Sequence, residues 1–299
     1  MNRYYKGIML VAVSAACFAL MPIFAVFAYK GNAGIATILF LRFGLAAVLL
    51  FAYLAWTKRL LPVDLRTLFQ LMLVGGVLYT LQSSLYFASV KYLSVSLQTM
   101  LFYTYPIFVA VEAAVFFKEK STRSLLLAIS ISVFGMVLLI GTSFDSINLL
   151  GAFLALAAAV VYSLYINIAN RLTANIPSDL ASAYICLFAS IAYLILGTLS
   201  KSLDFHFHLS AWLPIIGIAF FSTTISIFTL FKGLEILGST RSAIISLIEP
   251  LITIMISSLL FHDRMGYLQW IGGFLVLYGA YYVVKSRPEQ NHSRVECQD

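Results

Sequence analysis

The sequence predicts an all-α integral membrane protein with ten transmembrane helices, arranged as two inverted repeats of five helices each. Three observations predict this fold class: an apolar composition, ten hydrophobic runs of helix length, and a similarity between the two halves. Of 299 residues, 62% are apolar and 10% are charged, and the mean hydropathy is +0.96. Because a soluble domain carries about 25% charged residues, this composition excludes an ordinary globular protein and predicts a surface that faces lipid.

Each hydrophobic run is long enough to cross a membrane as a helix. A hydrocarbon core of about 30 Å requires roughly 20 apolar helical residues, and short polar links separate the runs. The runs are too long for barrel strands and do not alternate in polarity, which favours helices. The ten predicted spans are residues 7–28, 34–56, 67–90, 96–117, 124–142, 149–169, 178–199, 212–236, 243–261 and 266–284.

The basic residues predict the direction of the spans. Most of the 19 Lys and Arg residues lie on the side that holds the N-terminus, for example Arg3 and Lys58, whereas Lys30 and Lys201 lie in links on the other side. Cytoplasmic loops carry the excess of Lys and Arg, so both termini and the tail 285–299 are predicted to be cytoplasmic, in a multi-pass protein of the cell membrane. The net charge of +7 then follows from topology, and nucleic-acid binding is not needed to explain it.

The two halves of the chain are similar at a shift of 144 residues. The residues that coincide include Gly7 with Gly151, Thr80 with Thr224, Pro106 with Pro250, Gly135 with Gly279, and Glu119-Lys120 with Asp263-Arg264. Each half contains five predicted spans, so the second half enters the membrane from the opposite side. Residues 1–142 and 149–284 are therefore predicted to be inverted repeats, an arrangement that recurs in secondary transporters with a site near the bilayer midplane.

The coinciding segments also resemble a known family. The segment from Tyr105-Pro106 to Glu119-Lys120, the segment from Glu249-Pro250 to Asp263-Arg264, and Leu41-Arg42-Phe43 are similar to the EamA family of the drug/metabolite transporter superfamily. Asp263 stands where that family usually has Glu, and Lys118 stands where it usually has Gly. The resemblance covers essentially the whole chain. It implies ten helices around a central cavity and transport of amino acids, other metabolites or drugs.

Glu249 is the leading candidate for a functional residue inside the membrane. It lies deep in the ninth predicted span, and a charged side chain at mid-bilayer costs about 2.5–3.5 kcal/mol without a partner, water or a role. Pro250 has no N–H and would leave the carbonyl of Ser246 as a free acceptor beside the carboxylate. This pair would suit a cation, a substrate amine or a proton. The alternative is that Glu249 pairs with Lys232 or Arg241 and locks the helices together.

Polar and aromatic residues at helical spacing predict a cavity between the repeats. They share single faces of the third, fourth, sixth and ninth spans, where Tyr offers both an apolar ring and a hydroxyl. Any one small polar group could instead join two helices in lipid. The candidate substrate-binding residues are Tyr79, Gln82, Tyr86, Gln98, Tyr105, Tyr162, Ser246, Glu249 and Thr253. Pro106 is expected to break the fourth span as Pro250 breaks the ninth.

Two further charged residues lie inside predicted spans. Glu112 is a second candidate for coupling, although its place nearer the cytoplasmic end favours a structural pair. Arg42 could bind a substrate carboxylate through two hydrogen bonds, and a structural pairing is the preferred interpretation. The cysteines are scattered without metal-ligand spacing, so neither a metal site nor a cofactor is predicted.

These features favour a secondary transporter that exports small metabolites such as amino acids by alternating access, with protons coupled through Glu249. The export direction and the substrate class rest on the family resemblance. The alternative within transport is facilitated or inward movement of a carboxylated or phosphorylated solute held by Arg42. The alternative from another functional class is an intramembrane enzyme or a receptor. The catalytic motifs HExxH and GxSxG are absent from the sequence, and no catalytic residue is predicted. The predicted partners are a small-molecule substrate, the lipid bilayer and protons. A second copy of the chain, in a homodimer, is an alternative partner.

Overall fold

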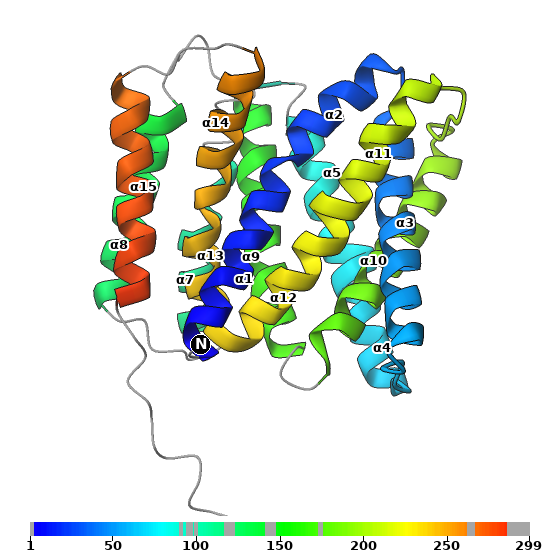
Figure 1. Ribbon diagram of the computed structural model, residues 1–299, viewed down its shortest axis with the longest axis horizontal. Helices are drawn as coiled ribbons and strands as arrows, with labels where there is room; N and C mark the ends of the chain where they lie inside the picture. The colour runs from blue at the N-terminus through cyan, green and yellow to red at the C-terminus, as the bar shows by residue number, and fades with distance from the viewer. Residues whose placement is uncertain are drawn as a thin grey trace, which may run out of the picture.

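The computed structural model is helical throughout the part of the chain that it describes (Figure 1). That part comprises residues 3–89, 92–93, 98, 101–116, 123–140, 148–172, 176–261 and 267–285. Helices long and apolar enough to cross a membrane are Arg3–Lys30, Ile35–Trp56, Leu65–Tyr86, Leu149–Leu172, Ser178–Leu199 and Leu209–Leu237. Each of them coincides with a predicted span. The prediction of an all-helical protein with several membrane-crossing helices is therefore confirmed.

The first predicted span bends near its middle. α1 (Arg3–Ala19) and α2 (Met21–Lys30) meet at Leu20, and Pro22 stands in the first turn of α2. Proline has no N–H to donate to the preceding turn, which explains why the helix is interrupted there. α3 (Ile35–Trp56) then runs back toward the end of the molecule that holds the N-terminus, at the bottom of Figure 1.

The third and eighth predicted spans each contain a π-helical segment. The third consists of α4 (Leu65–Met72), η1 (Leu73–Tyr79) and α5 (Thr80–Ser89). The eighth consists of η2 (Leu209–Ala211), α11 (Trp212–Ala219), η3 (Phe220–Ile225) and α12 (Ser226–Leu237). The hydroxyls of Thr80 and Thr224 donate to carbonyls five residues earlier, at 3.1 and 2.8 Å, and so support the widened turns. Such turns are rare and occur frequently at functional sites.

The fourth and ninth predicted spans are both interrupted just before a proline. α7 (Tyr105–Val115) begins after a turn at Tyr103 and Thr104. α13 (Ser239–Ser246) and α14 (Ile248–Phe261) meet at Leu247. Pro106 and Pro250 therefore stand in the first turns of α7 and α14, where a missing backbone N–H costs least.

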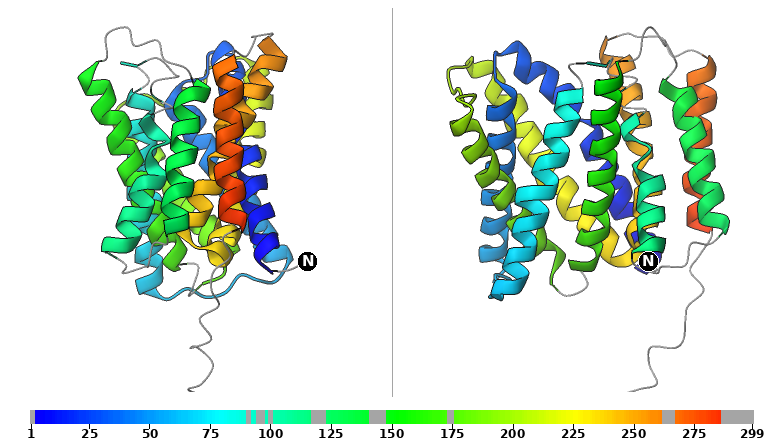
Figure 2. Two further views of the ribbon diagram at one scale, coloured as in Figure 1. Left: turned by 90° about the vertical axis from the view of Figure 1, so that its left-hand side faces the viewer. Right: turned by 180° about the vertical axis from the view of Figure 1, so that it is seen from behind.

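The remaining helices are α8 (Arg123–Ile140), α9 (Leu149–Leu172), α10 (Ser178–Leu199) and α15 (Tyr267–Lys285). α8 packs on α15 at one side of the molecule, and α3 packs on α10 at the other side (Figures 1 and 2). Between these pairs α1 packs on α12, and α9 packs on α5 and η1. At the shift of 144 residues, the contact of α1 with α12 corresponds to the contact of α9 with α5.

Two glycines show this correspondence at the level of single residues. A methyl group added at Gly7 would lie 2.9 Å from the Leu237 side chain, and one added at Gly151 would lie 2.7 Å from the Leu93 side chain. Leu93 and Leu237 are themselves 144 positions apart. Glycine thus allows α1 and α9 to approach equivalent neighbours closely in the two halves.

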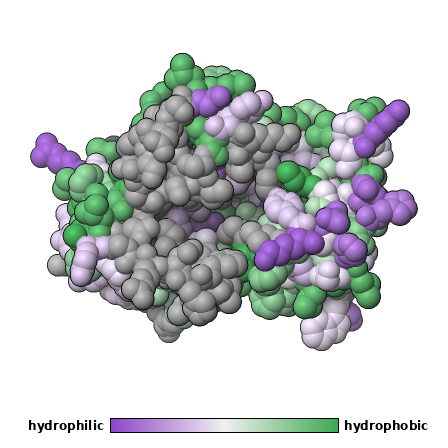
Figure 3. All heavy atoms as spheres, turned by 90° about the horizontal axis from the view of Figure 1, so that it is seen from above, coloured by the Kyte–Doolittle hydropathy of each residue, from purple (hydrophilic) through white to green (hydrophobic). Residues whose placement is uncertain are grey.

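Hydrophobic side chains cover much of the outer surface. Examples are Leu199, 77% exposed, and Phe274, 69% exposed. Seen from above, hydrophilic side chains gather on the side where α2, α3 and α11 lie (Figure 3). The predicted acid–base pairs Glu119-Lys120 and Asp263-Arg264, Lys118, and the tail beyond Lys285 lie outside the described residues.

Candidate functional site

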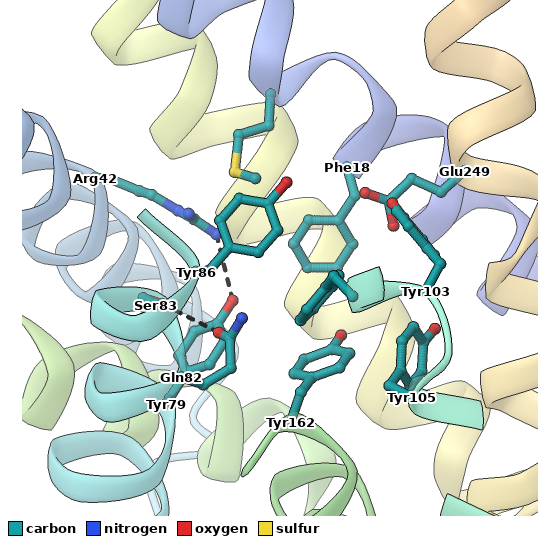
Figure 4. Close-up of a pocket in the computed structure, with 12 residues that line it drawn as sticks. Phe18, Arg42, Tyr79, Gln82, Ser83, Tyr86, Tyr103, Tyr105, Tyr162 and Glu249 are labelled. Carbon is teal, nitrogen blue, oxygen red and sulfur yellow. Dashed lines mark hydrogen bonds between the residues drawn. The ribbon is translucent and has the colours of Figure 1, made fainter. Parts of the chain in front are cut away.

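A central cavity lies between elements of both halves of the chain. About 550 Å³ of space free of atoms lies between its walls, a volume that includes space open to the surroundings. Its walls come from the junction of α1 with α2, from α3, η1 and α5, from the start of α7 and the segment before it, and from α9 and α14 (Figure 4). The lining residues are Phe18, Met21, Arg42, Tyr79, Gln82, Ser83, Tyr86, Phe102, Tyr103, Tyr105, Tyr162 and Glu249.

Many of the residues singled out in the sequence meet in this cavity, although they lie far apart in the chain. Tyr79 comes from η1, Tyr162 from α9 and Glu249 from α14. The sequence candidates that line the cavity are Arg42, Tyr79, Gln82, Tyr86, Tyr105, Tyr162 and Glu249. The cavity therefore combines one cationic side chain and one carboxylate with a largely aromatic wall.

Glu249 and Arg42 lie on opposite sides of the cavity. The Tyr103 hydroxyl points toward the Glu249 carboxylate, and the Phe18 ring lies on the same side (Figure 4). Within the described part of the chain, Glu249 forms no ion pair with Lys232 or Arg241. Glu249 therefore does not form, in this conformation, the ion pair that was the alternative to a functional role. Its carboxylate faces the cavity instead.

Arg42 is buried in the middle of α3, with 4% of its surface exposed. Its Nε donates to the Thr223 hydroxyl at 2.8 Å, and its Nη2 donates to the Tyr79 hydroxyl at 3.3 Å. The guanidinium carbon lies 4.7 Å from the centre of the Phe43 ring. Among the residues that the structure describes, no carboxylate lies within 4 Å of Arg42. The side chain is therefore held by neutral groups and has no paired anion.

Aromatic rings pack against one another along one wall of the cavity. The Tyr79 and Tyr165 rings stack with their centroids 4.7 Å apart, and the Tyr105 and Tyr162 rings meet edge to face at 4.8 Å. Tyr165 lies one helical turn beyond Tyr162 on α9, is 1% exposed, and also stacks on Tyr162. Edge-to-face and offset stacks of this kind each stabilise the fold by about 0.5–1.5 kcal/mol beyond the burial of their surface, so these ring contacts stabilise this wall of the cavity.

Glu112 lies outside the cavity, at the contact between α7 and α9. Its carboxylate accepts hydrogen bonds from Ser163 Oγ at 2.6 Å and from Asn167 Nδ2 at 3.0 Å. The Asn167 amide also donates to the Val109 carbonyl at 3.2 Å. These bonds join the two helices.

Three other candidates do not line the cavity. Gln98 is fully buried beside Tyr86. Ser246 is buried at the end of α13, and the Thr253 hydroxyl donates to the Ala19 carbonyl at 3.2 Å. A single polar face along the ninth span requires a continuous helix, whereas the break at Leu247 places Ser246 in α13 and Glu249 in α14.

Phe18, Met21 and Tyr103 also line the cavity, although they were not predicted from the sequence. Phe18 and Met21 stand 144 positions before Tyr162 and Tyr165. Because Tyr162 is a candidate predicted from the sequence, its equivalent at the shift of 144 residues, Phe18, could have been predicted as well. Tyr103 carries no such signal, because its place in the cavity depends on the turn that precedes α7. No group of three His, Cys, Asp or Glu that could hold a metal occurs in the described part.

Comparison with known proteins shows where this chain belongs. A solved crystal structure has a TM-score of 0.79 at 16% sequence identity, covering 93% of this chain and 96% of the other, which shows a shared fold. An uncharacterized transporter, YcbK of Bacillus subtilis (strain 168), is 25% identical over 89% of this chain and 88% of its own length. An uncharacterized transporter of Archaeoglobus fulgidus is 26% identical over 83% of this chain and 87% of its own length.

The family comparison covers both halves. The sequence profile of the EamA-like transporter family matches residues 5–141 and again residues 149–285. Together with the membrane-crossing helices, the two matches identify a multi-pass membrane transporter, whose partners are a small-molecule substrate and the lipid bilayer, and exclude an enzyme as the family-level function. The chain belongs to the EamA-like transporter family.

Proposed function

We propose that this protein is a secondary transporter that exports small metabolites, such as amino acids or related compounds, by alternating access. The observation that carries the proposal is the central cavity, in which Arg42 and Glu249 face each other across aromatic walls. Pockets for small molecules are mostly apolar, with a few placed polar groups that fix the orientation of the ligand. A solute with charged groups and an apolar portion matches this lining.

We further propose that ten spans form two inverted repeats which exchange conformations around the cavity. The equivalent contacts of Gly7 and Gly151 support this arrangement, as do the π-helical segments that end near Tyr79 and Thr223. Inverted repeats have similar energies in two opposite orientations, so a rocking motion exposes one midplane site to either side in turn. We assign closure of the cavity on one side in this conformation to the aromatic rings stacked around Tyr165.

Glu249 is the group that we assign to proton coupling. A carboxylate that faces a cavity inside the bilayer can take up a proton from one side and release it to the other as the cavity changes its opening. Glu112 is the weaker candidate, because Ser163 and Asn167 already occupy its oxygens. Glu249 therefore enters the proposed cycle as the coupling residue, with a proton as its partner.

The orientation proposed from the basic residues places both termini in the cytoplasm and the protein in the cell membrane. The end of the molecule that holds the N-terminus would then be the cytoplasmic end (Figure 1). Assembly as a homodimer stays a prediction.

Flux into proteoliposomes tests the proposed function. Purified protein is reconstituted, and radiolabelled amino acids are followed with and without an imposed proton gradient. We expect chemically unchanged solute to accumulate and the gradient to change its rate. The absence of net flux for every amino acid, with the reconstituted protein folded, would contradict the assignment of amino acids as substrates.

A second candidate is transport of an anionic, carboxylated or phosphorylated solute without proton coupling. The burial of Arg42 without a nearby carboxylate favours it. Glu249 opposes it, since a solute with two negative charges would meet a carboxylate on the opposite wall. The same flux assay distinguishes the two candidates, because a purely anionic solute would then be transported in preference to a neutral amino acid.

A further inference from the structure

We propose that Arg42 is the anchor for a carboxylate group of the transported solute, and that Thr223 is the positioning residue that presents Arg42 to the cavity. The inference rests on the proposed transport of small metabolites and specifies which part of the solute binds where. It concerns a contact between α3 and η3, which lie in different halves of the chain.

Arg42 has more hydrogen-bond donors than its two protein partners occupy. A guanidinium carries five N–H donors and cannot lose its charge in a protein. Thr223 and Tyr79 accept one hydrogen bond each, and no other hydrogen bond from this side chain is made within the described part of the chain. Arg42 also lines the cavity. Donors are therefore left for a ligand at the cavity surface.

The charge of Arg42 also favours an anionic ligand. A buried cation held only by neutral partners is unfavourable, and an anion that arrives with two acceptor oxygens removes this cost. A carboxylate has the planar geometry that the guanidinium matches. Glu249 on the opposite wall supplies one negative charge, which would attract an ammonium group of the same solute (Figure 4). The pair of walls thus suits a zwitterion, with its carboxylate at Arg42 and its ammonium group at Glu249.

Thr223 orients the guanidinium group of Arg42. Its hydroxyl donates to the Ile218 carbonyl at 2.9 Å, so its oxygen lone pairs point to the Nε–H of Arg42. Thr223 is fully buried and is not part of the cavity wall, so it acts on the solute only through Arg42. Together with Tyr79 it fixes the plane of the guanidinium before the solute arrives, which reduces the entropy lost on binding.

The neighbouring residue provides a matched control. Thr224 lies in the same π-helical segment, and its hydroxyl donates to the Ala219 carbonyl at 2.8 Å. Both Thr223→Val and Thr224→Val remove one hydroxyl bond to a carbonyl five residues earlier, with little change in shape. Only Thr223→Val removes an acceptor from Arg42. A merely structural role of the π-helical segment would affect the two variants alike.

The experiment compares acids with their amides. Binding of L-leucine and L-phenylalanine to the full-length protein in detergent is measured beside L-leucinamide and L-phenylalaninamide, which keep the ammonium group and lose the carboxylate. We expect the wild-type protein and Thr224→Val to bind the acids about 10- to 100-fold more tightly than the amides, as charge-assisted hydrogen bonds predict. We expect Thr223→Val to lose most of this ratio and Thr223→Ser to restore it.

The outcomes separate the two proposals. Equal binding of acids and amides by the wild-type protein would overturn the role of Arg42 and leave transport through the cavity standing. The same ratio in Thr223→Val as in Thr224→Val would overturn the positioning role of Thr223. Failure of the folded protein to bind any of the four compounds would overturn the carboxylate site at Arg42, whereas only the absence of flux for every amino acid in proteoliposomes would contradict the proposed function.

Discussion

Gly7 and Gly151, 144 positions apart, make equivalent close contacts, each with a residue of the other half of the chain. Gly7 on α1 faces Leu237 at the end of α12, and Gly151 on α9 faces Leu93 beyond the end of α5. Equivalent residues thus meet equivalent partners across the molecule. A duplicated chain whose halves pack on each other in a reciprocal way has this property, and it supports the two-state exchange proposed for the cavity.

Substitution of either glycine is expected to destabilise the protein by a similar amount. Gly7→Ala and Gly151→Ala place a methyl group within 3 Å of a neighbouring side chain, which forces overpacking at a cost of about 1–3 kcal/mol. Gly76→Ala is the control, because its nearest neighbour would lie at 3.6 Å, an ordinary contact distance. Thermal unfolding in detergent measures the effect. A Tm unchanged in Gly151→Ala would contradict the close packing of α9.

The proposed orientation predicts the location of two reporters. A reporter fused to the C-terminus should be active on the cytoplasmic side, and one inserted in the loop 200–211 should be active outside. The physical reason is the excess of Lys and Arg on the side of the N-terminus. Reporter activity in whole cells measures both. Both reporters on one side of the membrane would show that the number of spans between them is wrong.

Replacement of the cavity carboxylate is expected to remove proton coupling. Glu249→Gln keeps the size of the side chain and loses the ionisable group, so an imposed proton gradient should no longer change the flux. Glu112→Gln is the comparison, since that carboxylate binds Ser163 and Asn167 outside the cavity. We expect it to lower the Tm and to keep the response to the gradient. Coupling that survives in Glu249→Gln but not in Glu112→Gln would reverse the assignment.

Removal of one ring is expected to open the closed side of the cavity. Tyr165→Ala deletes a side chain that stacks on Tyr79 and Tyr162 and should cost about 3–5 kcal/mol of stability. Tyr165→Phe keeps the ring and serves as the control. A pH-sensitive dye trapped in proteoliposomes measures proton leak, which should rise in Tyr165→Ala only. Equal leak in both variants would indicate that the ring layer is not the seal.

Much of the site could be predicted because helical periodicity places residues on a common face. Tyr79, Gln82 and Tyr86 were grouped by their spacing alone, and all three line the cavity. Membrane-crossing helices are the most predictable elements, since the lipid requires every backbone group to be bonded within its own segment. The repeat shift adds long-range information that a single span does not contain.

The remaining features depend on breaks in the helices and on contacts across the fold. Periodicity placed Ser246 with Glu249, but the break at Leu247 separates them. The bond of Arg42 to Thr223 joins residues 181 positions apart, and it depends on the widened turn of η3. Pro250 predicts that the ninth span is interrupted, but it does not predict that the interruption falls between Ser246 and Glu249. The π-helical turn has no pattern in side-chain polarity from which it could be derived.

The most direct test of the central claim is the accessibility of Gln82 from both sides of the membrane. Gln82→Cys is made in a chain whose native cysteines are replaced by Ser, and a membrane-impermeant thiol reagent is applied to right-side-out and inverted vesicles. Gln82 lines the cavity, so alternating access predicts labelling from either side and protection by a transported solute. Labelling from one side only, under every condition including active transport, would contradict alternating access.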